Sequence, residues 1–129
     1  MDLHESREVT SIFGGDHFTG RVWLDRLLDE PGENGMRTYR VFFEPAARTH
    51  WHTHPGGQAL LILAGRARVG AAGQPTREAA PGDVVYSPPG EWHWHGAAPD
   101  HFMTHLSLTE GDTEWGKHVA DAEYHDEPQ

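Results

Sequence analysis

The stretch HTHPGGQALLILAG, residues 52–65, holds two histidines at alternate positions, then a turn, an amide and an apolar run that ends in glycine. His50 precedes this pair at the same spacing. Side chains two residues apart on a strand share one face. We therefore expect His50, His52 and His54 to point the same way and the residues between them to point to the opposite face.

A second stretch, EWHWHGA at residues 91–97, repeats this alternation with His93 and His95. Two imidazoles on one face lie close enough to bind a single cation. A His-x-His pair by itself is weak evidence, because isolated pairs are more often ordinary surface or core polarity. The residues around the two stretches therefore decide what they mean.

The rest of the chain predicts an all-β domain, because short runs of branched and aromatic residues alternate with Gly and Pro. We expect strands at 36–45, 58–70 (with a turn at Gly65), 82–89, 91–97 and 101–108. Residues 21–28 fit either a strand or a helical turn, and residues 113–125 are expected to be helical and packed outside. A length of 129 residues suits one domain, residues 1–129, with one modest core.

Composition excludes several classes of partner and site. Ten basic residues against twenty acidic ones give a net charge of −10, which argues against nucleic acid and anionic membranes as partners. The chain has no apolar run long enough to span a membrane, and its first residues do not resemble a secretory signal. We therefore expect a cytoplasmic protein. Without cysteine, any metal must be bound by nitrogen and oxygen.

The two stretches carry a resemblance to the small single-domain cupins. The first cupin motif runs H-x-H, then an acid or amide, then Gly; the second runs G, P-x-G, then H. The matching residues are His52, His54, Gln58 and Gly65, then Gly82, Pro88, Gly90 and His93. Gln58 replaces the usual Glu, and Ala46 stands where the first motif opens with Gly.

This resemblance covers about residues 18–110 and implies a double-stranded β-helix (jelly-roll) barrel with a short C-terminal helical segment. It implies four metal ligands: His52, His54, Gln58 and His93. Within the family, the chain is similar to bacterial cupins related to manganese-dependent hydroxynitrile lyases. That likeness implies a homodimer and a divalent ion, with Mn²⁺ expected first and Fe²⁺, Zn²⁺ or Ni²⁺ as alternatives.

The likeness also points to His95 and His105, which follow the last ligand on the same strand and on the next one. We expect His105 to act as general base and His95 as a second base or orienting group; alternatively, each hydrogen-bonds a metal ligand. Tyr39 and Val41 are expected to fill the core, and if one of them lines a substrate pocket we expect Tyr39.

Four neutral ligands leave the full charge of a divalent ion in place, which favours Lewis-acid chemistry over oxygen activation. The sequence therefore predicts a metal-dependent lyase, similar to hydroxynitrile lyases, acting on a small hydroxyl- or carbonyl-bearing substrate. A metal-dependent oxygenase or oxidative cleavage enzyme is the first alternative. A non-catalytic small-molecule-binding barrel is the second, because one fold supports many functions.

Overall fold

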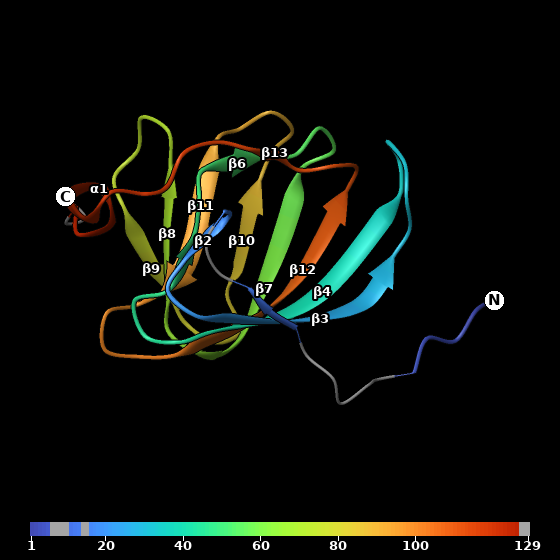
Figure 1. Ribbon diagram of the computed structural model, residues 1–129, viewed down its shortest axis with the longest axis horizontal. Coiled ribbons are helices and arrows are strands. Elements are labelled where there is room, and N and C mark those ends of the chain that lie inside the picture. The colour runs from blue at the N-terminus through green and yellow to red at the C-terminus, as the bar shows by residue number, and fades with distance from the viewer. Residues whose placement is uncertain (6–10, 14–15, 127–129) are drawn as a thin grey trace.

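The computed structural model describes residues 1–5, 11–13 and 16–126, so parts of both ends of the predicted domain lie outside the described residues. Almost all described elements are strands, and they form two antiparallel sheets that face each other (Figure 1). This confirms the all-β barrel that the sequence predicts. Among the described residues, no helix is long and apolar enough to cross a membrane.

The first sheet has six strands, with β12 in its middle between β4 and β7. The pairing of β12 with β7 shifts register between Thr104 and His105. In sheet order the strands are β1 (Ser11–Phe13), β3 (Val22–Asp29), β4 (Met36–Phe43), β12 (Met103–Glu110), β7 (Gln58–Gly65) and β10 (Val84–Ser87).

The second sheet has seven strands and is built around β11. Its main path is β13 (Glu114–Trp115), β6 (His52–Thr53), β11 (His93–Ala97), β5 (Arg48–Thr49) and β2 (Phe18–Thr19). Two further strands extend it, since β8 (Ala67–Ala71) pairs with β11 and β9 (Arg77–Ala79) pairs with β8. Strands β9 and β10 are therefore edges of different sheets.

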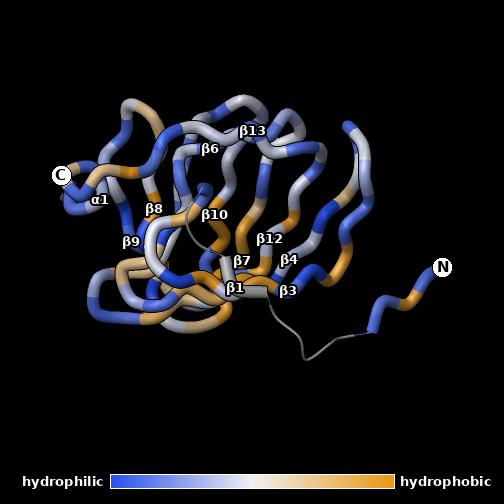
Figure 2. Tube along the Cα trace, in the orientation of Figure 1, coloured by the Kyte–Doolittle hydropathy of each residue, from blue (hydrophilic) through white to orange (hydrophobic). Residues whose placement is uncertain are grey.

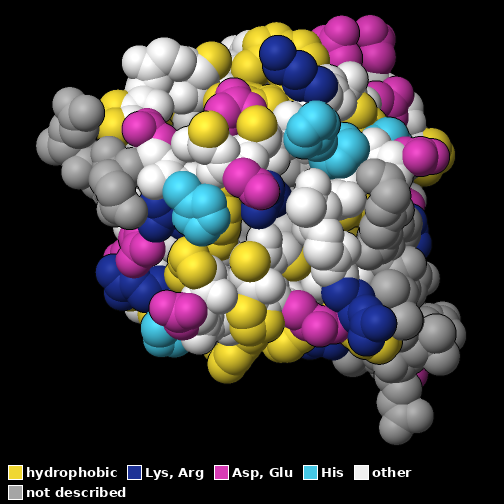
Figure 3. Space-filling view, turned by 60° about the vertical axis from the view of Figure 1, so that its left-hand side comes forward, with side chains coloured by type: hydrophobic (Ala, Val, Ile, Leu, Met, Phe, Trp, Pro, Cys, Tyr) yellow, Lys and Arg dark blue, Asp and Glu magenta, His cyan; other side chains and the backbone are white. Residues whose placement is uncertain are grey.

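The core lies between the sheets and follows the period-two pattern of the strands. In β7, Gln58, Leu60 and Ile62 are buried, whereas the side chains between them are more exposed. Hydrophobic stretches follow strands such as β7 and β10, and the exposed loops are mostly hydrophilic (Figure 2). On the face shown in Figure 3, the described Lys and Arg side chains are interspersed with Asp and Glu.

Most expected strands are confirmed, including residues 21–28, which form a strand and not a helical turn. The turn at Gly65 separates β7 from β8. Gly65 has φ 76°, and a Cβ there would lie 1.9 Å from the Phe102 carbonyl oxygen, so only glycine fits this turn.

The helix predicted over residues 113–125 is wrong for most of that segment. Residues 114–115 form β13, and the only helix in the described part of the chain is α1 (Asp121–Tyr124). The reason is tertiary pairing: the Gly116 amide donates to the Trp51 carbonyl at 2.7 Å, and the Trp51 amide donates to the Lys117 carbonyl at 2.9 Å. These contacts use backbone groups that a helix would need, and they override local propensity.

Candidate metal centre

Strand pairing brings the predicted ligands together from distant parts of the chain. His52 on β6 lies opposite His93 on β11, with ring centroids 4.3 Å apart. The ring of His54 lies 5.0 Å from His52 and 5.3 Å from His93, and Gln58 begins β7 on the facing sheet. All four side chains are buried.

Backbone carbonyls fix the orientation of two of these rings. Nδ1 of His52 lies 2.8 Å from the His50 carbonyl oxygen, and Nδ1 of His93 lies 3.0 Å from that of Glu91. A carbonyl oxygen only accepts, so each Nδ1 carries the proton and donates it. In a neutral ring, Nε2 is then left with a free lone pair, as a metal ligand requires.

His54 follows the same pattern with a side-chain partner. Its Nδ1 lies 3.2 Å from Thr113 Oγ1, and its Nε2 is buried with no hydrogen-bond partner among the described residues. An unpartnered buried nitrogen is costly unless something binds it. The three rings therefore engage Nδ1 and leave Nε2 for another partner.

Gln58 contributes an amide oxygen to the same group of side chains. Its Nε2 donates to Thr109 Oγ1 at 2.9 Å, which directs Oε1 toward His93, 3.1 Å from His93 Nε2. His93 already donates from Nδ1, and burial lowers its pKa, so the neutral ring has no second proton to give. Two lone-pair donors thus face each other, and a cation held by both residues would relieve their repulsion.

Two further histidines adjoin this group. His95 belongs with His52 and His93 to a set whose possible ligand atoms all lie within 4.8 Å of one another. His105 Nε2 lies 3.1 Å from His95 Nδ1, so the two rings form a buried hydrogen-bonded pair. His95 Nε2 and His105 Nδ1 have no partner among the described residues.

Burial keeps these imidazoles neutral. Desolvation, followed by neighbouring histidines, holds the pKa of His52 and of His95 well below the usual value. Desolvation is also the main cause that lowers the pKa of His54 to about 4 and that of His105 to about 3. At neutral pH the cluster therefore offers lone pairs without competition from protons.

An interior cavity of about 100 Å³ adjoins the cluster and reaches both Tyr39 and Val41. Val41 is buried in the core, whereas Tyr39 is only partly buried. The Tyr39 hydroxyl donates to Asp29 Oδ1 at 2.8 Å, and burial, together with this carboxylate, raises the pKa of Tyr39 to about 12. Tyr39 therefore stays protonated, and it forms part of the cavity wall.

Three residues of the site carry no sequence signal. Thr109 orients Gln58, Thr113 contacts His54, and the ring of Trp115 lies 4.9 Å from that of His52. Thr113 and Trp115 belong to the segment expected to be helical and external. Their roles depend on the pairing of β13 with β6, which period-two reasoning on the histidines does not reveal.

Comparisons with known proteins place this geometry in context. A family model described as "Cupin domain" matches residues 39–107. An (R)-mandelonitrile lyase from Granulicella tundricola is 46% identical over 113 residues, which cover 84% of this chain and 86% of that protein. A dimethylsulfoniopropionate lyase from Ruegeria pomeroyi is 32% identical over 103 residues, covering 78% of this chain and 51% of that protein.

Among solved structures, a cupin-like protein from Thermotoga maritima superposes with a TM-score of 0.84 at 43% identity, covering 96% of this chain and 95% of that one. A DMSP lyase from Ruegeria pomeroyi superposes with a TM-score of 0.62 at 26% identity, covering 89% of this chain and 58% of that one.

Proposed function

The chain belongs to the cupin family, and on that premise we propose that it is a metal-dependent lyase that cleaves hydroxynitriles. One observation carries the metal requirement: His93 Nε2 and Gln58 Oε1 lie 3.1 Å apart, and both present lone pairs. The substrate class is proposed from the 46% identity to a protein named (R)-mandelonitrile lyase.

His52, His54, Gln58 and His93 would hold the ion, each through its unprotonated nitrogen or its amide oxygen. Mn²⁺ is the ion we propose, with Fe²⁺, Zn²⁺ and Ni²⁺ as alternatives that elemental analysis distinguishes, because nitrogen-rich sites do not select a metal by affinity alone. A divalent ion bound there supplies a Lewis acid that lowers the pKa of a hydroxyl group beside it.

His95 is placed to take the hydroxyl proton. Its Nδ1 faces His105 Nε2, so donation from His95 Nδ1 leaves His95 Nε2 free to accept a proton inside the cluster. The O–H electron pair then forms the carbonyl bond, and the bond to the nitrile carbon breaks. Cyanide leaves with the electron pair of that broken carbon–carbon bond and receives the proton back from His95.

In this scheme His105 is a positioning residue that accepts from His95. This arrangement exchanges the two roles expected from the sequence. The support for it is that His95, and not His105, belongs to the compact set with His52 and His93.

The test combines metal content with product formation. We expect purified protein to contain a divalent metal and to release benzaldehyde from mandelonitrile, followed by absorbance. His52→Ala and His93→Ala should lose both metal and activity. His95→Asn should retain metal while kcat falls by roughly 10²- to 10⁴-fold. His118→Ala, at an exposed histidine, is the matched control.

Metal content unchanged in both alanine variants would overturn the site. Metal without cleavage of mandelonitrile would overturn the reaction, and dimethylsulfoniopropionate and oxygen uptake are then assayed in the same preparation.

A further inference from the structure

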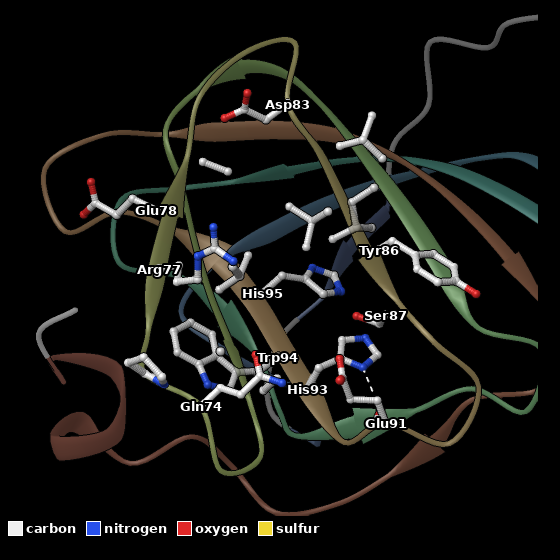
Figure 4. A pocket seen from close by; sticks show the side chains of 18 residues that line it. Gln74, Arg77, Glu78, Asp83, Tyr86, Ser87, Glu91, His93, Trp94 and His95 are labelled. Atoms are coloured by element: carbon white, nitrogen blue, oxygen red, sulfur yellow. Dashed lines mark hydrogen bonds between the residues drawn. The ribbon is translucent and has the colours of Figure 1, made fainter. Parts of the chain in front are cut away.

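A second, larger cavity opens between the edge strands β9 and β10. Its volume is about 430 Å³, within the range of small-molecule sites, and it extends inward to His93 and His95 (Figure 4). His95 also lines the interior cavity, so its ring stands between the two spaces. The reaction proposed above uses His93 and His95 at the inner end of this side cavity but none of the other residues that line it.

Arg77 lies on the inner face of the edge strand β9. Ala79, two residues further along, is buried in the core, and residues two apart on a strand share a face. Arg77 pairs with Val69 on β8, and Val69 pairs with His95 on β11. His95, Val69 and Arg77 therefore form one row of neighbouring residues on the inner face of β11, β8 and β9. Arg77, at the end of this row, is exposed to solvent in the cavity.

The guanidinium of Arg77 has no ion pair or hydrogen bond with the described residues. Every other arginine in the described part of the chain forms an ion pair. This contrast is notable in a chain with twenty acidic and ten basic residues. A positive charge that faces inward without an acidic partner fits recognition of an anion from outside the chain.

The acidic residues around the cavity do not supply that partner. Glu78 binds Arg66 at 2.6 Å and Arg68 at 3.0 Å, and the Asp83 carboxylate accepts from the Ala80 amide at 2.8 Å. In Figure 4 both carboxylates lie at the rim, whereas Arg77 lies nearer to His95. Glu91 lies near His93, away from Arg77 (Figure 4). Its negative charge would repel a ligand anion at that end of the cavity, so an anionic group is favoured at Arg77.

Part of the remaining wall is apolar, and a buried serine hydroxyl lies beside it. Leu60, Val69 and Val85 line it, and the hydroxyl of the buried Ser87 forms no hydrogen bond with the described residues. We propose that the side cavity binds a small carboxylate with an apolar body, its carboxylate on Arg77 and its body against these three side chains. Such a ligand would lie next to His95, which lines both this side cavity and the interior cavity.

Binding of benzoate to the purified, metal-containing protein tests the proposal, with benzamide as the neutral analogue of the same shape. We expect calorimetry to show benzoate binding that weakens at least about tenfold in Arg77→Gln, the scale of one charge-assisted contact. Benzamide should bind at least about tenfold more weakly than benzoate for the same reason. Arg21→Gln, at an exposed arginine elsewhere, should bind benzoate as the unmodified chain does.

A crystal structure with benzoate locates the ligand and separates this site from the interior one. Density between β9 and β10, on Arg77, supports the proposal. Density beside Tyr39 and Val41 would overturn it, as would equal benzoate affinity in Arg77→Gln. No binding at about 10 mM benzoate, where a millimolar site would be filled, would also overturn it, as would a second copy of the chain occupying the cavity. Hydroxynitrile cleavage is not a readout, so the outcome does not depend on the reaction proposed above.

Discussion

At the scale of single residues, Gln58 in the proposed metal site would set how much of its charge a bound cation keeps. An amide oxygen and imidazole nitrogens are neutral donors, so none of them cancels the charge of the ion. The orientation of the amide is not free, because Thr109 accepts from its Nε2 and leaves Oε1 to face His93. In the proposed site, a cation held by these neutral donors would therefore polarise a bound oxygen strongly.

Gln58→Glu tests this directly. A carboxylate at this position adds a negative donor, so we expect the variant to retain metal against a chelator at least as well as the unmodified chain. Hydroxynitrile cleavage should fall about tenfold or more, because the ion polarises the substrate hydroxyl less. Stopped-flow chelation and benzaldehyde release measure the two effects. Gln74→Glu, outside the cluster, should change neither, and faster cleavage in Gln58→Glu would contradict the electrostatic argument.

His105 makes the metal-free protein sensitive to acid. Burial lowers its pKa from 6.5 to about 3, so between these values the unfolded chain binds a proton that the folded chain does not. Stability from this group is complete above pH 6.5 and is lost as the pH falls toward 3.

We expect the free energy of unfolding of chelated protein to decrease between pH 6 and 4, with His105 contributing about 1.4 kcal/mol per pH unit. Urea denaturation at several pH values measures the slope. His105→Gln should have a shallower slope by about that amount, and His118→Gln should not. Equal slopes in all three proteins would show that His105 does not titrate as its burial requires.

At the scale of elements, Ala46 stands in a conformation that suits glycine. It is the one described residue other than glycine with positive φ, at 67°. The left-handed region places Cβ close to the following carbonyl oxygen, which strains any L-residue with a side chain. Ala46 lies just before β5, and its amide donates to the Ala98 carbonyl at 3.1 Å. The chain then continues through β5 to the histidines.

Ala46→Gly is therefore expected to stabilise the protein by about 1 kcal/mol, since removing the strain exceeds the entropy that glycine loses on folding. Urea denaturation measures the change. Ala72→Gly, at an exposed turn position without positive φ, should be neutral or destabilising. A loss of stability in Ala46→Gly would show that the methyl group contributes more packing than strain.

Period-two spacing was sufficient to predict that His52 and His54 share one face, because strand faces follow from local geometry. That His93 joins them was implied by the resemblance to cupins, since spacing within one strand does not say which strands become neighbours. Period-two spacing also placed His95 beside His93 on one face. It could not supply Thr109 or Thr113, since their contacts depend on which strands become neighbours. The same limit explains the wrong helix at residues 113–125, where backbone contacts to Trp51 decide the structure.

At the scale of the whole molecule, the C-terminal segment is anchored by Tyr124. This side chain is fully buried, its hydroxyl donates to the Ala97 carbonyl on β11, and its ring packs near Trp94. The guanidinium of Arg48 lies 4.3 Å from the ring centroid. The anchor thus covers the outer face of the strand that bears His93 and His95 on its inner face.

We expect Tyr124→Ala to lower the free energy of unfolding by about 3–5 kcal/mol, the usual cost of removing a buried aromatic ring. Tyr124→Phe should cost about 1 kcal/mol, for one lost hydrogen bond. Tyr86→Phe, at a tyrosine that is 62% exposed, is the control and should have little effect. A decrease in the free energy of unfolding below about 1 kcal/mol in Tyr124→Ala would mean that packing of the C-terminal segment does not stabilise the sheet.

Metal removal should also act on the whole molecule, because Gln58 belongs to one sheet and His52 and His93 belong to the other. A ligand at a hundredfold excess over its Kd stabilises the folded state by about 2.7 kcal/mol. Calorimetry should therefore show a lower Tm after chelation and recovery when Mn²⁺ is restored. His52→Ala should show no such response, and an unchanged Tm in the unmodified chain would contradict a bridging site.

That the donor atoms come from both layers has a consequence for how the protein matures. In the unfolded chain the histidine and glutamine side chains are far apart. The complete set of proposed ligands would form only after the two sheets have packed against each other. In the proposed site a misfolded chain would lack the complete ligand set, so we expect it to bind no metal and to have no metal-dependent activity.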